Sequence, residues 1–362
     1  MGEEDYSIND ILEAANEIKG TSDIHLKVGI PPYFRINGNL EEIDAPRLSK
    51  DSLKDIAKSI LIKNQQVKLG EEGDVDISFK LKKDESVLSR YRVHICKDDN
   101  GYSVDMRIVP DNIIPIESIG FPYEAVWKDI VNQKEGLILV TGKTGSGKTT
   151  TMASLIQRIN ETRGEHIVTI EDPIEYVYHP NMSIITQREV GSSVISFEKG
   201  LEGALRQDPN VILIGEIRDK ETAYIALEAA GTGHLVFSTL HTMNAIDSVR
   251  QYVKFFSKEE QENVRTTLAS SLNYVLSQQL IPYQAEVGRS LAMEIMNVRD
   301  SDAIKSLLRD GKEHQIMTHL QTGQKYGMIT MDDSLKNLHH EGRISLDDLK
   351  TYSHNPKDLV IN

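Results

Sequence analysis

Residues 142–149 read Gly-Lys-Thr-Gly-Ser-Gly-Lys-Thr and fill every fixed position of the phosphate-loop pattern G-x-x-x-x-G-K-[ST]. The apolar run 136–141 before the loop predicts a strand, and residues 149–161 after it predict a helix. Glycines let successive main-chain N–H groups curl around a polyphosphate, and the helix N-terminus adds a partial positive charge. The stretch therefore predicts a nucleotide site in which Lys148 reaches the β- and γ-phosphates and the Thr149 hydroxyl ligates Mg²⁺.

Composition limits what the rest of the chain can be. Its 362 residues, 39% hydrophobic and 27% charged, predict two or three ordinary globular domains. A net charge of −14 argues against general nucleic-acid binding and against an anionic membrane surface. Cys96 is the only cysteine, which excludes an intramolecular disulfide and a tetracysteine zinc site. No run is apolar and long enough to span a membrane, and the acidic start 1–5 has no signal core, so we expect a cytoplasmic protein.

The first part of the chain, residues 1–110, has the pattern of an α+β domain. Ser7 is a candidate cap for an amphipathic helix, and residues 23–28 alternate as a half-buried strand does. Asn37-Gly38 predicts a hairpin turn, and residues 49–69 predict a single helix. Three strictly alternating strands follow, and Asn100-Gly101 predicts the turn between the last two.

That last hairpin carries a set of charged residues. If its apolar side chains face inward, one outward face presents Arg90, Arg92, His94, Asp105 and Arg107. Such a face is either plain solvated sheet or a surface that offers guanidinium groups to a phosphate, and the sequence leaves both interpretations open.

The remaining chain changes pattern after residues 109–122, a proline-containing stretch that predicts a linker. Strands are predicted at 136–141, 166–171, 210–215 and 234–239, and helices at 149–161, 197–206, 219–230 and 258–279. This alternation is typical of a parallel sheet covered by helices, with ligands at the carboxyl ends of the strands. The tail from about 290 to 362 is predicted to be mostly helical.

Two strand ends add carboxylates to the predicted nucleotide site. Residues 211–216 form an apolar run that ends in Glu216, which suits an acid that holds Mg²⁺ directly or through water. Residues 167–175 deliver Glu171, Asp172 and Glu175 around one proline. A carboxylate in this place can orient or deprotonate the attacking water, whereas for Glu171 we expect only capping or solvation.

Two histidines flank the apolar strand in residues 231–242. His234 begins the strand, where a structural role is the simpler interpretation. His241 follows its far end, at the sheet edge expected to carry phosphate, and is a candidate for hydrogen bonding to the γ-phosphate or to water.

Taken together, these segments resemble the secretion-superfamily ATPases of type IV pili and type II secretion, over nearly the whole chain. The family's Walker A loop is 142–149, its Asp box 169–176, its Walker B segment 211–219 and its His box 233–242. Within the family, residues 22–26, 29–32, 303–309 and 327–332 are most similar to the pilus retraction ATPases. Lys143 stands where proline is common, and Lys305 and Ser306 depart from the family's usual tail motif, so a divergent or accessory retraction ATPase is an alternative.

The resemblance implies an α/β fold with a PAS-like N-terminal α+β domain (1–110), a linker (111–122), a RecA-like P-loop ATPase domain (123–290) and a helical C-terminal region (291–362). It implies ATP and Mg²⁺ as cofactors, with nucleotide between the two domains and near the next subunit. Glu175 would be the general base, Glu216 the Mg²⁺-linked acid and His241 a γ-phosphate contact, although the two glutamates' roles can be exchanged. The nucleotide-binding set is Thr144, Gly145, Ser146, Gly147, Lys148, Thr149 and Thr150, with Thr149 and Glu216 for the metal. Arg90, Arg92 and Arg107 lie in the hairpin that supplies arginine fingers, and which of them does so stays open.

The implied function is an Mg²⁺-dependent ATP hydrolase, a homohexameric motor for pilus retraction and twitching motility. Its expected place is the cytoplasmic face of the inner membrane, which it would reach only through a PilC-like platform protein. Three rival hypotheses remain: an assembly or type II secretion ATPase, a nucleic-acid translocating motor, and a regulator that senses nucleotide without hydrolysing it. We expect no stable nucleic-acid binding, because the chain is acidic.

Overall fold

The chain divides into two compact units in a computed structural model that describes residues 7–83, 86–109, 112–284 and 288–356. The first unit comprises Met1–Asn112 with Pro173–Val177, and the second comprises Ile113–Asp172 with Tyr178–Asn362. The acidic start 1–5 and the first linker residue, Asp111, lie outside the described residues. The predicted division into the four segments 1–110, 111–122, 123–290 and 291–362 stays a prediction.

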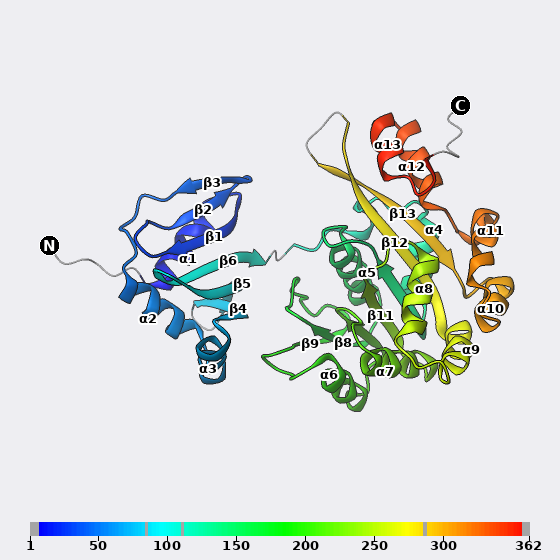
Figure 1. The fold of residues 1–362 in the computed structure, drawn as a ribbon, viewed down its shortest axis with the longest axis horizontal. Helices are drawn as coiled ribbons and strands as arrows, with labels where there is room; N and C mark the ends of the chain where they lie inside the picture. Colours follow the sequence, from blue (N-terminus) through cyan, green and yellow to red (C-terminus); the bar gives the residue numbers. More distant parts are fainter. Residues whose placement is uncertain (1–6, 84–85, 110–111, 285–287, 357–362) are drawn as a thin grey trace. The chain divides into compact units, whose positions relative to one another are not determined.

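In its described residues, the first unit has a six-stranded antiparallel sheet and three helices (Figure 1). The strand order is β3-β2-β1-β6-β5-β4. Its strands are β1 (Thr21–Lys27), β2 (Tyr33–Ile36), β3 (Asn39–Glu42), β4 (Asp74–Lys83), β5 (Ser86–Asp98) and β6 (Gly101–Val109), and its helices are α1 (Ile8–Glu17), α2 (Lys50–Ile60) and α3 (Lys63–Glu72). Ser7 caps α1 as predicted, and its hydroxyl accepts from the Asp10 N–H. Asn37 (φ 50°) and Gly38 (φ 91°) form the predicted β2–β3 turn, in the left-handed conformation that such turns need.

The single helix predicted at 49–69 is wrong. The chain extends at Leu61 (φ −97°, ψ 132°), and α3 begins after it. The extended conformation buries Leu61 in the core of the first unit, and the Gln65 side chain accepts the Ile62 N–H at 3.0 Å. Burial of Leu61 and the cap at Ile62 therefore favour a break between two helices over the single helix that the sequence pattern predicted.

The second unit contains a seven-stranded sheet in the order β13-β12-β7-β11-β10-β8-β9. Its strands are β7 (Gly136–Thr141), β8 (His166–Glu171), β9 (Ile184–Glu189), β10 (Val211–Ile214), β11 (Leu235–Leu240), β12 (Leu272–Pro282) and β13 (Arg289–Asn297). Neighbouring strands are parallel except β12 and β13, which pair antiparallel at one edge (Figure 1). The parallel sheet predicted from the alternating pattern is thus present.

Helices and alternating strand residues form the core of the second unit. The helices are α4 (Glu124–Asn132), α5 (Lys148–Thr162), α6 (Phe197–Ala204), α7 (Lys220–Gly231), α8 (Ala245–Lys254), α9 (Gln261–Ser271), α10 (Asp302–Arg309), α11 (Ile316–Gln321), α12 (Met331–His340) and α13 (Leu346–Tyr352), with short 3-10 turns at Ile116–Ser118, Leu205–Gln207, Glu313–Gln315 and Gln324–Tyr326. Leu137 and Leu139 of β7 join a buried cluster with residues of α6 to α11. Ile138 and Val140 are equally buried and face the other side of the sheet, because side chains alternate along a strand.

Two predictions for the later part of the chain are corrected by β12 and β13. The helix predicted at 258–279 ends at Ser271, and the rest of that stretch is β12. The tail predicted to be helical begins with β13. Both strands are buried on nearly every residue, so their sequences lack the alternation that identifies a half-exposed strand.

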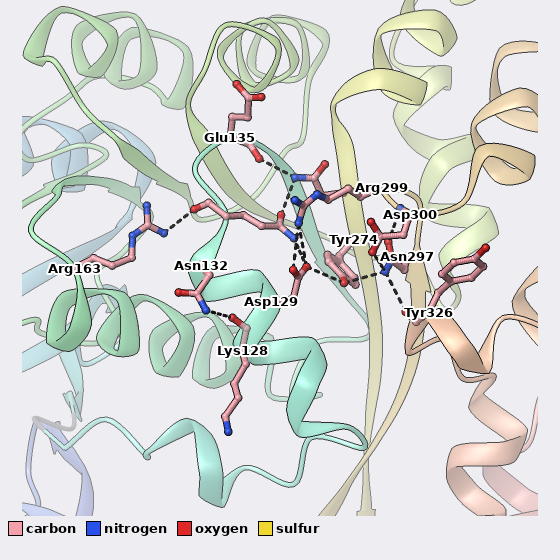
Figure 2. Close-up of polar contacts among 12 residues, drawn as sticks. Lys128, Asp129, Asn132, Glu135, Arg163, Tyr274, Asn297, Arg299, Asp300 and Tyr326 are labelled. Atoms are coloured by element: carbon pink, nitrogen blue, oxygen red, sulfur yellow. Dashed lines mark hydrogen bonds and ion pairs between the residues drawn. The ribbon is translucent and has the colours of Figure 1, made fainter.

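Polar side chains link α4 to β12 and β13 near the amino ends of the parallel strands (Figure 2). The Tyr274 hydroxyl donates to Asp129 at 3.1 Å and accepts from Asn297 at 3.0 Å. Burial, and then the Asp129 carboxylate, raise the pKa of Tyr274. Arg299 adds an ion pair to Asp129 at 3.2 Å. These partners satisfy one another, which explains the cluster as a structural support for the sheet.

Candidate functional site

The phosphate loop connects β7 to α5 through three glycines with positive φ. These are Gly142 (φ 142°), Gly145 (φ 79°) and Gly147 (φ 86°), and α5 begins directly after them at Lys148. A Cβ atom on Gly142 would lie 2.4 Å from the main-chain oxygen of Gln278. The loop therefore needs glycine at 142 both for its conformation and for the space beside β12.

Lys148 is held at the centre of the loop. Its side chain is buried, and its Nζ donates to the main-chain oxygens of Gly142 (2.8 Å) and Lys143 (3.1 Å). Thr144 and Gly145 are exposed, Ser146 is buried, and Thr149 and Thr150 are half-buried. The first turn of α5 thus combines an ammonium group, two hydroxyls and the helix N-terminus, which is a set of groups suited to a polyphosphate.

The strand register brings the loop and the predicted histidine to one edge of the sheet. β7 and β11 are parallel neighbours, and Thr141 pairs with Leu240. Gly142 and His241 are the next residues along these strands, so both leave the sheet at its carboxyl edge. β10 lies on the other side of β11 and leads through Gly215 to Glu216.

Glu216, His241 and Arg218 form one cluster at this edge. The Glu216 side chain is only 14% exposed, and its Oε1 accepts from Arg218 Nη2 at 2.5 Å. His241 Nε2 lies 3.3 Å from Glu216 Oε2. The hydrogen bond to Glu216 raises the pKa of Arg218. The structure therefore brings together two residues predicted separately. It adds Arg218, which the sequence analysis placed in the Walker B segment 211–219 without giving it a role.

His234, predicted to be structural, lies directly before β11, and its Nδ1 is 3.0 Å from the Ala229 main-chain oxygen. For Glu171 the prediction was capping or solvation. Its side chain is buried and accepts from Thr169 Oγ1 at 2.6 Å and from Gln187 Nε2 at 3.2 Å. These two donors hold the buried carboxylate at the end of β8, so solvation does not describe Glu171, and a local structural role does.

Glu175 and the three arginines belong to the first unit, whereas Lys148, Glu216 and His241 belong to the second. Arg92 Nη1 lies 3.9 Å from Glu175 Oε1, and both side chains are nearly half exposed. Arg107 Nε donates to Asp23 at 2.7 Å, and Arg90 is half-buried. Burial opposes ionisation of Asp23, but hydrogen bonds from Ser22 and Arg107 lower its pKa. On the predicted outward face, Arg107 therefore forms a short hydrogen-bonded pair with Asp23, whereas the contact of Arg92 with Glu175 is longer, at 3.9 Å.

A buried carboxylate holds the helix that follows His241. Glu294 of β13 accepts from the Ala245 N–H at 2.7 Å, at the start of α8, and from the Met331 N–H at 3.5 Å, at the start of α12. Burial raises the pKa of Glu294; the Ala245 N–H and His354 oppose this rise, and Asp332 adds to it. One side chain thus binds the first turns of two helices.

This environment predicts a pH-dependent contribution to stability. Because the folded-state pKa of Glu294 is raised, its contribution is fully present below the unfolded-state value and is lost as pH rises through the folded-state pKa. Glu294→Gln keeps a neutral acceptor at every pH, so it does not lose stability when the wild-type carboxyl ionises. We therefore expect the melting temperature of the variant, relative to that of the wild type, to increase by roughly 2–4 °C between pH 5 and 8. This shift corresponds to about 1 kcal/mol in a domain of this size. Thermal unfolding of both proteins across this range is the measurement. Parallel curves for the two proteins contradict the prediction.

The oxygen donors near the loop suit magnesium. A hydroxyl at Thr149 and a carboxylate at Glu216 are the hard ligands that Mg²⁺ prefers, together with phosphate and water. Within residues 7–83, 86–109, 112–284 and 288–356, no group of three or more His, Cys, Asp or Glu side chains could hold a metal ion. No described helix is long and apolar enough to cross a membrane.

The parallel sheet, the glycine loop around Lys148 and the Glu216–His241 pair define a P-loop ATPase. The family model described as type II/IV secretion system protein matches residues 5–360, so the chain belongs to this family. The twitching motility protein of Neisseria gonorrhoeae is 38% identical over 98% of this chain and 92% of its own length. The type IV pilus retraction ATPase PilT of Pseudomonas aeruginosa is 38% identical over 96% of this chain and 98% of its own.

A crystal structure of the pilus retraction motor PilT with bound ADP has a TM-score of 0.87 and 41% identity, covering 98% of this chain and 99% of that one. The comparisons confirm the predicted fold class and the predicted ATPase family.

Proposed function

We propose that this protein is an ATP hydrolase that powers retraction of type IV pili. The similarity to named retraction proteins over nearly the whole chain carries this proposal. The complete phosphate loop supports it, because β7, the three glycines and Lys148 have the geometry that a polyphosphate requires. The tail motif 303–309, which supported the retraction branch, lies on α10.

The second unit supplies most of the proposed binding groups. The main chain of residues 144–147 and the Lys148 ammonium bind the β- and γ-phosphates, with Thr149 and Thr150 at the start of α5. Thr149 and Glu216 hold Mg²⁺, which when bound neutralises charge on the phosphate oxygens. His241 contacts the γ-phosphate, and its place beside Glu216, at 3.3 Å, fixes the ring toward this edge of the sheet.

Proton transfer is assigned to a carboxylate. Glu175 is the proposed general base, because it is exposed enough to meet a water molecule, whereas Glu216 is already bound to Arg218. The exchange of these two roles is tested below. Arg92 is the first candidate for an arginine finger, because its 3.9 Å contact with Glu175 is longer than the 2.7 Å hydrogen bond from Arg107 to Asp23. Arg90 and Arg107 stay alternatives.

Retraction also implies an assembly. We propose a homohexamer that acts on a PilC-like platform protein at the cytoplasmic face of the inner membrane, without stable binding to nucleic acid. The acidic net charge of −14 supports the last point, because a nucleic-acid track favours a basic surface.

Complementation tests the direction of the motor. Expression in a Pseudomonas aeruginosa strain that lacks PilT should restore twitching to a large fraction of the wild-type zone and remove the excess of surface pili. The Lys148→Ala variant, expressed to the same level, is the matched control and should restore nothing. Sustained ATP hydrolysis by the purified protein, with no recovery of twitching and no loss of pili, would favour an assembly or secretion ATPase instead.

A further inference from the structure

Gln278 of β12 makes a direct contact with the phosphate loop. The residue is 1% exposed, and its Nε2 donates to the Ser146 main-chain oxygen at 2.7 Å. A carbonyl oxygen only accepts hydrogen bonds, so the amide nitrogen must be the atom that faces it. The contact comes from a strand 132 positions further along the chain, which no local motif indicates.

Both ends of the loop also pack against Gln278. A Cβ on Gly142 would lie 2.4 Å from the Gln278 main-chain oxygen, and a Cβ on Gly147 would lie 3.2 Å from its Nε2. The main chain of the loop therefore approaches Gln278 at Gly142 and Gly147, and between these two glycines it accepts the hydrogen bond from Gln278 at Ser146.

The residue before Gln278 holds the strand that enters the loop. Ser277 Oγ lies 2.7 Å from Thr141 Oγ1, and Ser248 Oγ donates to Thr141 Oγ1 at 3.2 Å. Ser248 Oγ in turn lies 2.6 Å from Thr242 Oγ1, next to His241. The end of β7 is thus fixed from β12 and from α8, so Gln278 acts on a loop whose entry point is already set.

The chemistry of Gln278 fits a positional role better than a stabilising one. Its Oε1 is buried and has no hydrogen-bond partner among the described residues. An unpaired buried acceptor lowers stability, and an apolar side chain of the same size would avoid that cost. What an apolar side chain cannot do is bond the Ser146 oxygen and so set the direction of the neighbouring amides.

We propose that Gln278 is a positioning residue for nucleotide binding, which orients the main-chain amides of residues 144–147 toward the β-phosphate. The inference rests on the proposed function of the loop. It assigns no chemical step to Gln278, so its loss acts equally on ATP and ADP and changes KM rather than kcat.

The test replaces Gln278 by methionine, which keeps the length and removes the donor. Gln279→Met is the matched control, because this neighbour points to the other side of the strand. For Gln278→Met we expect the Kd for ADP and the KM for ATP to rise about five- to tenfold, because one hydrogen bond is lost. We expect kcat to stay within about twofold of the wild-type value. Circular dichroism and thermal melting should show a folded protein with nearly unchanged melting temperature.

Gln278→Glu is the second variant, since it keeps the shape but places a carboxylate oxygen against the Ser146 oxygen, and we expect a larger rise in Kd. Wild-type affinity in both variants overturns the proposal. So does loss of the folded state in both, because the role would then be general stability. Failure of the wild-type protein itself to bind ADP contradicts the proposed function instead.

Discussion

Lys148→Ala is expected to abolish nucleotide turnover and to weaken nucleotide binding severely. Lys148 is the cation at the centre of the loop, and its two bonds to loop oxygens place the ammonium group where the phosphates are expected. Removing a preorganised charge from such a site costs about 10²–10³-fold in rate or more. Phosphate release and titration with a fluorescent adenine nucleotide, each with magnesium present, measure the two effects.

The control for this experiment is Lys254→Ala, which removes an exposed lysine at the end of α8 in the same unit. It should keep wild-type binding and turnover, so that any loss in Lys148→Ala reflects position rather than net charge. Circular dichroism establishes that both variants are folded. Saturable binding by Lys148→Ala with the wild-type Kd would remove the phosphate loop from the proposed mechanism.

The second large effect is expected at the two carboxylates. Glu216→Gln and Glu175→Gln should both keep a Kd for ATP within a few-fold of the wild-type value. Both should hydrolyse ATP about 10²–10⁴-fold more slowly, the range expected when a catalytic proton acceptor is lost, and we expect a similar loss for the carboxylate that holds Mg²⁺. Glutamine keeps the size of each side chain and removes only the charge. Glu228→Gln, at an exposed position of α7, is the control.

A magnesium titration separates the two roles. If Glu216 holds the metal and Glu175 is the base, Glu216→Gln needs several-fold more Mg²⁺ for half-maximal activity, whereas Glu175→Gln keeps the wild-type midpoint and loses only kcat. If instead Glu175→Gln needs more Mg²⁺ and Glu216→Gln keeps the wild-type midpoint, then Glu175 holds the metal and Glu216 is the base. Normal turnover in both variants contradicts the proposed mechanism altogether.

The sequence predicted those parts of the site whose geometry is determined by a short, continuous stretch of residues. The loop 142–149 follows a strand and precedes a helix, so Lys148 and Thr149 needed no tertiary information. Glu216 and His241 were found because each follows an apolar strand. Their approach to 3.3 Å depends on the order of β7, β11 and β10, which no local pattern contains.

The residues that were missed act through distant contacts. Gln278 and Glu294 lie on β12 and β13, and the first of these strands was predicted as helix. Strands buried on both faces lack the alternation that identifies strands with one exposed face, and a polar side chain within them looks like an exposed position. The bonds of Gln278 to Ser146 and of Glu294 to two helix starts exist only after the sheet has formed.

The bonds of Lys148 to Gly142 and Lys143 have a thermodynamic consequence for affinity. A free lysine loses rotamer entropy worth roughly 1.5–2 kcal/mol when it is immobilised. Here that loss belongs to folding, because the side chain is already ordered inside the loop. A nucleotide therefore meets a cation that is preorganised, and the entropy opposing association comes mainly from the nucleotide itself.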